Sequence, residues 1–207
     1  SHSVLSGQVI VRIIAGRWGG RRLPPIRDSG VRPTTDRVRE ALMSALSARG
    51  LLQDARVLDL FCGTGALGLE ALSRGAIAAK FIDKQRSLLK QLHQFAHSLD
   101  PDARIDTQAV DLLSNPTKAA ASIAREASPD EAYSLVFVDP PYAHIAKIPN
   151  LVGAIHSAGL LTRGATIVVE HSSREPIDGI PGLQTMATYH YGDTGVILFE
   201  NAEETTP

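Results

Sequence analysis

The chain has 207 residues, of which 43% are hydrophobic and 21% charged, and its formal net charge is −1. A chain of this length accommodates one domain with a complete hydrophobic core and a small appendage. We find no apolar run of the roughly 18 residues that span a bilayer and no secretory signal pattern. The single cysteine, Cys62, excludes an intramolecular disulfide and a multi-cysteine zinc site, so we expect a protein of the reducing cytoplasm.

Positive charge is concentrated near the amino terminus. Residues 1–50 hold nine arginines, no lysine and three acidic residues, a net charge of +6, whereas the remaining residues have a net charge of −7. Arginine presents a planar fork that suits phosphate, and it also stacks on bases, so this region points toward nucleic acid. A basic, solvated surface without a partner explains the arginines equally well.

The first 31 residues predict a β-hairpin arm. Two short extended runs flank the glycine-rich segment Gly16–Gly20, and a linker with two prolines follows. Thr34 and Thr35 are plausible caps for a helix that Gly50 ends. The apolar positions of that helix repeat with helical spacing. They are Val38, Ala41, Leu42, Ala45 and Leu46.

Apolar strands and amphipathic helices then alternate, which predicts an α/β fold with a parallel sheet covered on both faces. Two runs around Gly192–Gly195 predict a hairpin, so the sheet should finish with an antiparallel edge. We expect an arm at 1–31, a domain at 32–200 and a flexible polar tail at 201–207. Predicted strands are 56–60, 79–83, 105–110, 135–139, 166–170, 185–191 and 196–199; predicted helices are 66–74, 84–99, 117–127 and 148–158.

A glycine-rich loop follows the first of these strands. Its pattern, Gly63-x-Gly65-x-x-Gly68, lets the backbone approach a nucleotide-type cofactor, and by itself it also fits a dinucleotide fingerprint. Asp59 ends the strand, where a carboxylate can engage the ammonium group of an amino-acid-bearing cofactor and would repel a pyrophosphate. Asp83 ends the next strand, where an acid accepts both ribose hydroxyls. The alternative role for each acid is to cap the helix after its strand.

The segment Asp139-Pro140-Pro141-Tyr142 follows an apolar strand, at the edge where open α/β sheets hold ligands. An aromatic exocyclic amine is a poor nucleophile because its lone pair is delocalised into the ring. The Asp139 carboxylate and the Pro140 carbonyl can each accept one N–H and direct the lone pair toward a methyl donor, while the prolines fix φ. Tyr142 offers a flat stacking face, worth about 1–3 kcal/mol in related sites. Together with the glycine loop, the segment predicts methyl transfer from S-adenosylmethionine to a nucleobase amine.

With both motifs placed, the chain resembles the class I methyltransferases, and especially the bacterial 16S ribosomal RNA guanine-N2 methyltransferase family of RsmD type. The resemblance covers nearly the whole chain. It implies a Rossmann-like seven-stranded sheet whose last strand is antiparallel, preceded by a β-hairpin. It also implies S-adenosylmethionine as cofactor, no metal, and N2-methylguanine at the position usually numbered 966 of 16S RNA, made on an assembling small subunit; we expect a monomer. The segments that carry the resemblance are Arg12–Gly16, Gly20–Leu23, Arg32–Glu40, Asp59–Gly68, Asp139–Tyr142 and Tyr191–Thr194.

The resemblance also assigns roles to residues. Gly63 and Gly65 would line the cofactor, Asp83 would bind its ribose, and Val110, together with Asp111, would border its adenine. Asp139 to Tyr142 would hold the guanine. Trp18, at the hairpin tip, either stacks on RNA or covers the domain's own core, and the sequence leaves both open. The residues expected to dock RNA are Arg12, Arg17, Trp18, Arg21, Arg22, Arg32, Thr34 and Arg37.

Four other functions share some of these sequence features. An adenine-N6 DNA methyltransferase uses the same acceptor pair, but such enzymes usually carry an extra target-reading domain, and few residues precede the glycine loop here. A glutamine-N5 protein methyltransferase typically has Asn where this chain has Asp139. A non-catalytic RNA-binding assembly factor would not need intact cofactor and catalytic positions, and a dehydrogenase would share only the loop.

Overall fold

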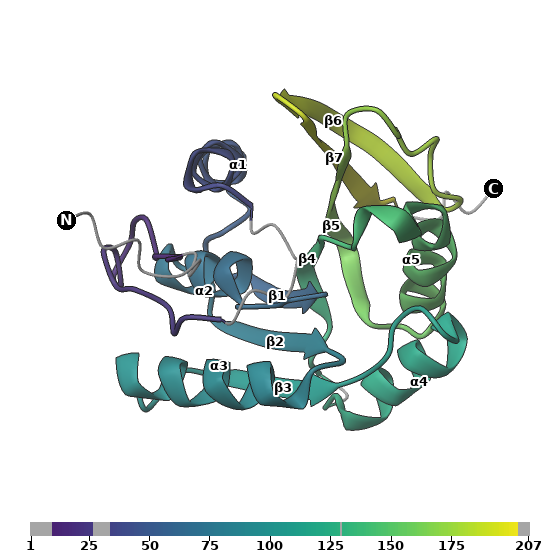
Figure 1. Cartoon of the computed structure of the whole chain (residues 1–207). Helices are drawn as coiled ribbons and strands as arrows, with labels where there is room; N and C mark the ends of the chain where they lie inside the picture. Colours follow the sequence, from purple (N-terminus) through teal and green to yellow (C-terminus); the bar gives the residue numbers. More distant parts are fainter. Residues whose placement is uncertain (1–9, 27–33, 129, 203–207) are drawn as a thin grey trace.

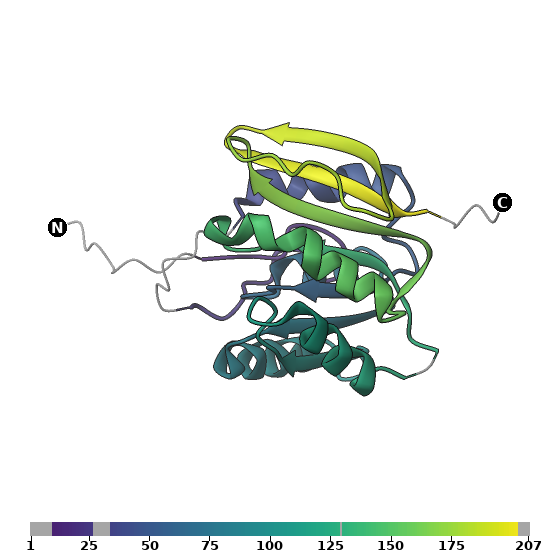
Figure 2. The same cartoon turned by 90° about the vertical axis from the view of Figure 1, so that its right-hand side faces the viewer.

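The computed structural model describes residues 10–26, 34–128 and 130–202. Within them the chain builds one seven-stranded sheet with helices on both faces (Figures 1 and 2). The helices are α1 (Asp36–Ala48), α2 (Ala66–Ser73), α3 (Arg86–Leu99), α4 (Pro116–Glu126), the 3₁₀ helix η1 (Tyr142–Lys147) and α5 (Ile148–Ser157). The strands are β1 (Arg56–Leu60), β2 (Ala78–Asp83), β3 (Ile105–Ala109), β4 (Tyr133–Val138), β5 (Leu161–Ser172), β6 (Leu183–Tyr191) and β7 (Thr194–Asn201).

The strands lie in the order β3-β2-β1-β4-β5-β7-β6. The first five are mutually parallel, and β7 pairs antiparallel with both β5 and β6. The predicted α/β sheet with an antiparallel last strand is therefore confirmed. The last strand in the chain lies inside the sheet, and β6 forms the edge, because the β6–β7 hairpin adds to β5 through its second strand.

Alternating side chains of the central strands enter two separate cores. In β1, Val57 belongs to the core beneath α1, α2 and α3, whereas Leu58 and Leu60 belong to the core beneath α4 and α5. Successive side chains of a strand point to opposite faces, so a strand covered on both sides must be apolar at nearly every position. This is why the central strands read as continuous apolar runs.

Most predicted elements agree with the structure, and three details differ. Strand β5 begins at Leu161, five residues before the predicted start. Within the described part of the arm, residues 10–26, the chain forms an isolated antiparallel bridge between Arg12 and Arg22 in place of two regular strands. Asn201 is the last residue of β7 and is buried, with its amide donating to the carbonyl of Thr162, so the tail does not begin at 201.

Helix α1 begins as the sequence indicates. The hydroxyl of Thr35 accepts a hydrogen bond from the backbone N–H of Val38, which satisfies one of the unpaired donors of the first turn. In the part of the chain that the structure describes, no helix is long and apolar enough to cross a membrane.

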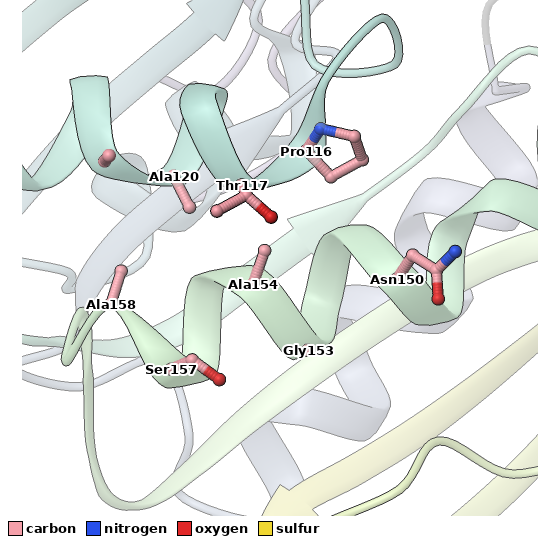
Figure 3. A pocket seen from close by; sticks show the side chains of 9 residues that line it. Pro116, Thr117, Ala120, Asn150, Gly153, Ala154, Ser157 and Ala158 are labelled. Carbon is pink, nitrogen blue, oxygen red and sulfur yellow. The ribbon is translucent and has the colours of Figure 1, made fainter.

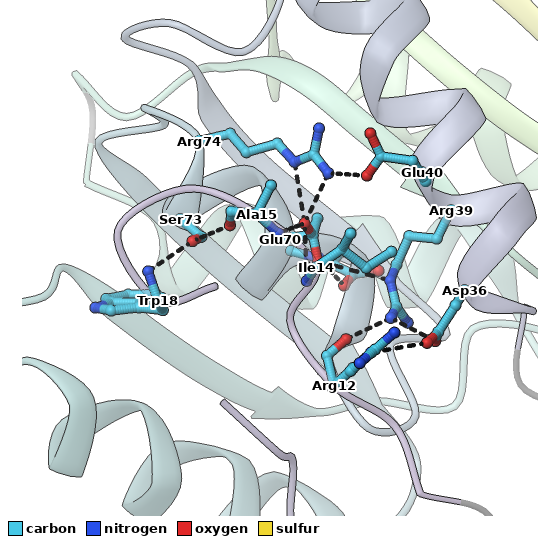
Figure 4. A network of polar contacts seen from close by, with 12 residues as sticks. Arg12, Ile14, Ala15, Trp18, Asp36, Arg39, Glu40, Glu70, Ser73 and Arg74 are labelled. Atoms are coloured by element: carbon cyan, nitrogen blue, oxygen red, sulfur yellow. Dashed lines mark hydrogen bonds and ion pairs between the residues drawn. The ribbon is translucent and has the colours of Figure 1, made fainter. Parts of the chain in front are cut away.

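The arm is fastened to the domain by a buried carboxylate on α2 (Figure 4). Glu70 is fully buried and accepts hydrogen bonds from the backbone N–H groups of Ile14 (2.9 Å) and Ala15 (3.0 Å). It also pairs with Arg74 (3.0 Å) and lies 3.6 Å from the guanidinium of buried Arg39 on α1. One side chain therefore joins the arm, α1 and α2.

We expect Glu70→Ala to destabilise the protein by about 3–5 kcal/mol, because it removes the buried negative charge beside the buried Arg39 and leaves the N–H groups of Ile14 and Ala15 without their acceptor. Glu40→Ala is the matched control: Glu40 pairs with the same Arg74, but its side chain is 45% exposed, so the loss should stay below about 1 kcal/mol. Urea denaturation followed by circular dichroism measures both. Equal losses in the two variants would contradict this role of Glu70.

Candidate active site

Four acidic side chains gather at the carboxyl ends of adjacent strands, on the face covered by α1, α2 and α3. Each lies two residues after a side chain of the core on that face, and strand alternation therefore turns it to the same side. The strands are in register, since Val138 of β4 lies beside Val169 of β5 and Leu60 of β1 beside Ile82 of β2. The core residues and the acids that follow them are Val57 and Asp59, Phe81 and Asp83, Phe137 and Asp139, and Val168 and Glu170.

The glycine loop has the open backbone that its sequence predicts. Gly63 and Gly65 have φ of +55° and +79°, in the left-handed region. A Cβ at Gly63 would meet no atom within 4 Å, whereas one at Gly65 would meet Leu92 at 2.5 Å. Space in front of Gly63 is what a ligand approaching the loop requires, whereas Leu92 of α3 leaves no room for a side chain at Gly65.

Two of the acids hold this loop in shape. The Asp83 carboxylate accepts hydrogen bonds from the N–H of Gly63 (3.0 Å) and of Gln85 (2.9 Å). The Asp59 carboxylate accepts one from the N–H of Gly68 (3.0 Å), in the first turn of α2. The capping role that the sequence offered for Asp59 is thus present, and for Asp83 the bond to Gln85 serves the start of α3. The cofactor contacts of both acids stay predictions.

Asp59 is 1% exposed. Burial raises the pKa of its carboxyl to about 8, the N–H of Gly68 acts against this rise, and the charges of Asp139 and Asp83 add to it. A cation placed beside Asp59 would lower this pKa again. The group is therefore suited to a positively charged ligand.

Asp139 leaves the end of β4 and enters a proline turn. Pro140 is buried, Pro141 is exposed, and Tyr142, which begins η1, is 47% exposed. The hydroxyl of Thr34 lies 3.4 Å from the Asp139 carboxylate. Burial raises the pKa of Asp139 to about 6, while hydrogen bonding with Thr34 and Glu170 lowers it. The segment therefore holds a carboxylate and, three residues later, a half-exposed aromatic ring.

Glu170 is a member of the site that sequence reasoning missed. It is 4% exposed, and both of its carboxyl oxygens lie 3.1 Å from the Thr34 hydroxyl. Burial, and then the charge of Asp139, raise its pKa well above the ordinary range. The signal available was an acid at the end of an apolar strand, the same signal that singled out Asp59 and Asp83.

Val110 lies beside the end of β2, because its N–H donates to the carbonyl of Asp83 (3.0 Å). It is half-buried, and the exposed Asp111 next to it accepts N–H groups of its own turn, which lowers the pKa of that carboxyl. The structure thus brings Val110 to the loop and to Asp83, as the adenine assignment requires. That assignment itself stays a prediction.

The predicted RNA-docking residues other than Trp18 divide into three groups. Arg12, Arg17, Arg21, Arg22 and Arg37 are exposed; Arg12 pairs with Asp36 and Arg17 with Asp100. Thr34 faces the carboxylates instead of open solvent. Arg32 lies outside the described residues.

Trp18 corrects one of the predictions. The residue is 6% exposed and belongs to the core under α2 and α3. Its backbone N–H donates to the Ser73 hydroxyl, and the Arg17 guanidinium covers the indole ring at 4.2 Å. A ring so enclosed is not available to stack on a base. Trp18 therefore anchors the arm, since burying an indole releases a large apolar surface from water.

A groove of about 560 Å³ lies between α4 and α5 (Figure 3). Small side chains line it, Ala120 and Ala154 among them, and both helices cover the second core. The groove is therefore on the opposite face of the sheet from the four carboxylates. In the part of the chain that the structure describes, no group of three or more His, Cys, Asp or Glu side chains is placed to hold a metal ion.

Comparison with known proteins places the chain in a family. Residues 11–200 match the family model described as "Conserved hypothetical protein 95". The "Ribosomal RNA small subunit methyltransferase D" of Escherichia coli (strain K12) is 36% identical over 177 residues, covering 85% of this chain and 82% of that protein. The chain therefore belongs to the ribosomal RNA small subunit methyltransferase D family. The family resemblance that the motifs indicate is confirmed.

Solved structures agree with the family membership. The yhhF protein of Escherichia coli superposes with a TM-score of 0.75 at 32% identity, covering 95% of this chain and 99% of that one. An RNA methyltransferase from Salinibacter ruber, solved in complex with S-adenosyl-L-homocysteine, has a TM-score of 0.58 at 14% identity, covering 84% of this chain and 97% of that one. At that identity the second match shows the fold alone. The Rossmann-like methyltransferase fold of this family member is thus confirmed.

We expect Gly65→Ala to destabilise the protein more than Gly63→Ala. Both substitutions force an alanine into the left-handed region, at about 1–2 kcal/mol, but only at residue 65 does the new methyl group meet the confined Leu92, which adds about 1–3 kcal/mol. Thermal unfolding of the two variants measures the difference. Equal melting temperatures would contradict this packing of the loop.

Proposed function

We propose that the protein transfers the methyl group of S-adenosylmethionine to N2 of a guanine in 16S ribosomal RNA, at the position usually numbered 966, on the small ribosomal subunit. The observation that carries the proposal is the juxtaposition of the Asp139–Tyr142 segment with the open glycine loop at one edge of the sheet. The names of the family's members support the RNA and the subunit.

The residues at the loop fit S-adenosylmethionine. The open space at Gly63 admits the cofactor, Asp83 stands where its ribose hydroxyls need acceptors, and Val110 borders the same corner. Asp59, whose pKa burial raises to about 8, gains most from a cationic ammonium group nearby. When bound, the cofactor supplies a methyl group on a positively charged sulfur.

The protein's own residues then prepare the amine. Asp139 accepts one N2–H of guanine and the Pro140 carbonyl accepts the other, so the nitrogen lone pair turns out of the ring plane toward the methyl group. Tyr142 stacks on the base, which must be swung out of its RNA structure to reach the site. No covalent bond to the enzyme is needed, and the rate gain comes from positioning.

The test compares small-subunit RNA from cells that lack the gene with RNA from cells that regain it on a plasmid. We expect N2-methylguanine to fall by one residue per subunit without the gene, to return with the wild-type chain, and not to return with Asp139→Ala, whose S-adenosylmethionine affinity by calorimetry should change little. Nucleoside mass spectrometry measures the modification. An undiminished N2-methylguanine level would refute the guanine assignment, and loss of N6-methyladenine from the DNA of the same cells would favour the adenine-N6 DNA methyltransferase.

The arm supplies a second prediction. Arg21→Glu combined with Arg22→Glu should weaken RNA binding and lower the slope of log K against log salt by about 0.7–0.9 for each phosphate that the arm no longer neutralises. The control reverses two exposed charges on the opposite face, Lys118→Glu with Arg125→Glu on α4. Filter binding across a salt series distinguishes the two. If the control weakens binding as much, the arm is not the docking surface.

A further inference from the structure

Asp139 and Glu170 form a largely buried acidic pair closed by one hydroxyl. They follow directly after Val138 and Val169, which lie side by side in β4 and β5. The Thr34 hydroxyl, just before α1, is 3.1 Å from both Glu170 oxygens and 3.4 Å from Oδ2 of Asp139. Three segments remote in sequence thus meet at three oxygens of two carboxyl groups.

If both acids are ionised, this junction has fewer hydrogen atoms to donate than carboxyl oxygens to accept them. The Thr34 hydroxyl has one hydrogen to donate, and three carboxyl oxygens surround it. The ion pairs found among the described residues include neither acid, and the charge of Asp139 acts on a further acid, Asp59 of the neighbouring strand, whose pKa it raises. Glu170 is buried and Asp139 half-buried. Two carboxylates so close together, without an ion-pair partner among the described residues, repel each other strongly, so such pairs hold one proton between them.

We propose that Glu170 is a positioning residue of the methyl-transfer site: protonated, it donates a hydrogen bond to Asp139 and, with Thr34, fixes that carboxylate so that its remaining oxygen accepts the hydrogen of the target amine. The inference rests on the proposed function, because it needs Asp139 to be the acceptor. It adds a residue that acts through Asp139 without touching the base.

The ionisation of the two groups is consistent with this arrangement. Burial raises the pKa of Asp139 to about 6 and that of Glu170 well above its ordinary range. Between the two values Asp139 is ionised and Glu170 still carries its proton. Below the pKa of Asp139 the acceptor disappears; above that of Glu170 the pair becomes doubly charged and the hydrogen bond between the acids breaks. The methyl-transfer rate should therefore rise through about pH 6 and fall again at higher pH.

The decisive variants are Glu170→Gln and Glu170→Ala, compared with wild type in single-turnover methyl transfer to small-subunit particles from cells that lack the gene. Glutamine donates an N–H to Asp139 at every pH and still accepts from Thr34. We therefore expect Glu170→Gln to restore most of the rate that Glu170→Ala loses, a loss of about 10–100-fold. Its rate should keep the rise near pH 6 and lack the fall that wild type shows at higher pH.

Other outcomes overturn the inference. If Glu170→Ala is as fast as wild type, or if Glu170→Gln keeps the same high-pH fall, Glu170 does not hold Asp139 in this way. If both variants lose the rate equally while S-adenosylmethionine affinity and melting temperature stay at wild-type values, the ionised carboxylate is needed and the proton assignment is wrong. Thr34→Ser should retain the rate, and Thr34→Val should lose it, because only the hydroxyl is at stake.

A readout without substrate separates this inference from the proposed function. Infrared spectroscopy near neutral pH should show the band of a protonated carboxyl group that belongs to Glu170. Glu170→Gln should remove this band. Asp59→Asn should remove only the band of Asp59, the other acid with a high pKa, and leave the Glu170 band in place. If wild type methylates no guanine but this band is present, the proposed function fails while the shared proton stands. If methylation occurs and the band is absent, the inference fails and the function stands.

Discussion

The strict alternation of side chains along parallel strands is the constraint on which the site depends. Because β2, β1, β4 and β5 run side by side in register, a polar residue placed two positions after a core residue must emerge on the same face at the same edge. Four acids therefore collect above one core, with Asp59 level with Phe81 and Phe137 and the other three acids two residues nearer the edge. A shift of one residue in any of these strands would turn its acid to the α4–α5 face.

Gathering acidic side chains at one edge costs free energy because their charges repel one another, and each acid is stabilised by hydrogen bonds of its own. Asp83 accepts two backbone N–H groups, and Asp59 accepts one at the start of α2. Asp139 and Glu170 have Thr34 and each other. The backbone N–H groups reach Asp83 and Asp59 only while the glycine loop and the starts of α2 and α3 keep their shape, so the loop geometry and the ionisation of these acids depend on each other. The same crowding of negative charge favours a cationic ligand at this edge.

Helix α2 links the arm to the site. It starts at the glycine loop, and its middle carries Glu70, which holds the backbone of the arm and the buried Arg39 of α1. Helix α1 in turn begins one residue after the threonine pair, of which Thr34 contacts Asp139 and Thr35 caps the helix. The attachment of the arm and the contact of Thr34 with Asp139 therefore depend on the same two helices, so we expect a change in one to affect the other.

The sequence by itself determined the alternating elements, the open glycine loop, the acids at the strand ends and the Asp139–Tyr142 segment, because these are local: hydrophobic period, glycine spacing and proline pairs act within a few residues. It could not decide the fate of Trp18, since a hairpin tip with an indole fits either solvent or a core, and only the packing of the arm on α2 buries the ring. Nor could it find the partner of Glu170, which is Thr34, 136 positions away. Contacts between distant segments depend on how helices seat on the sheet, and the exposure, ionisation and role of a side chain follow from that seating.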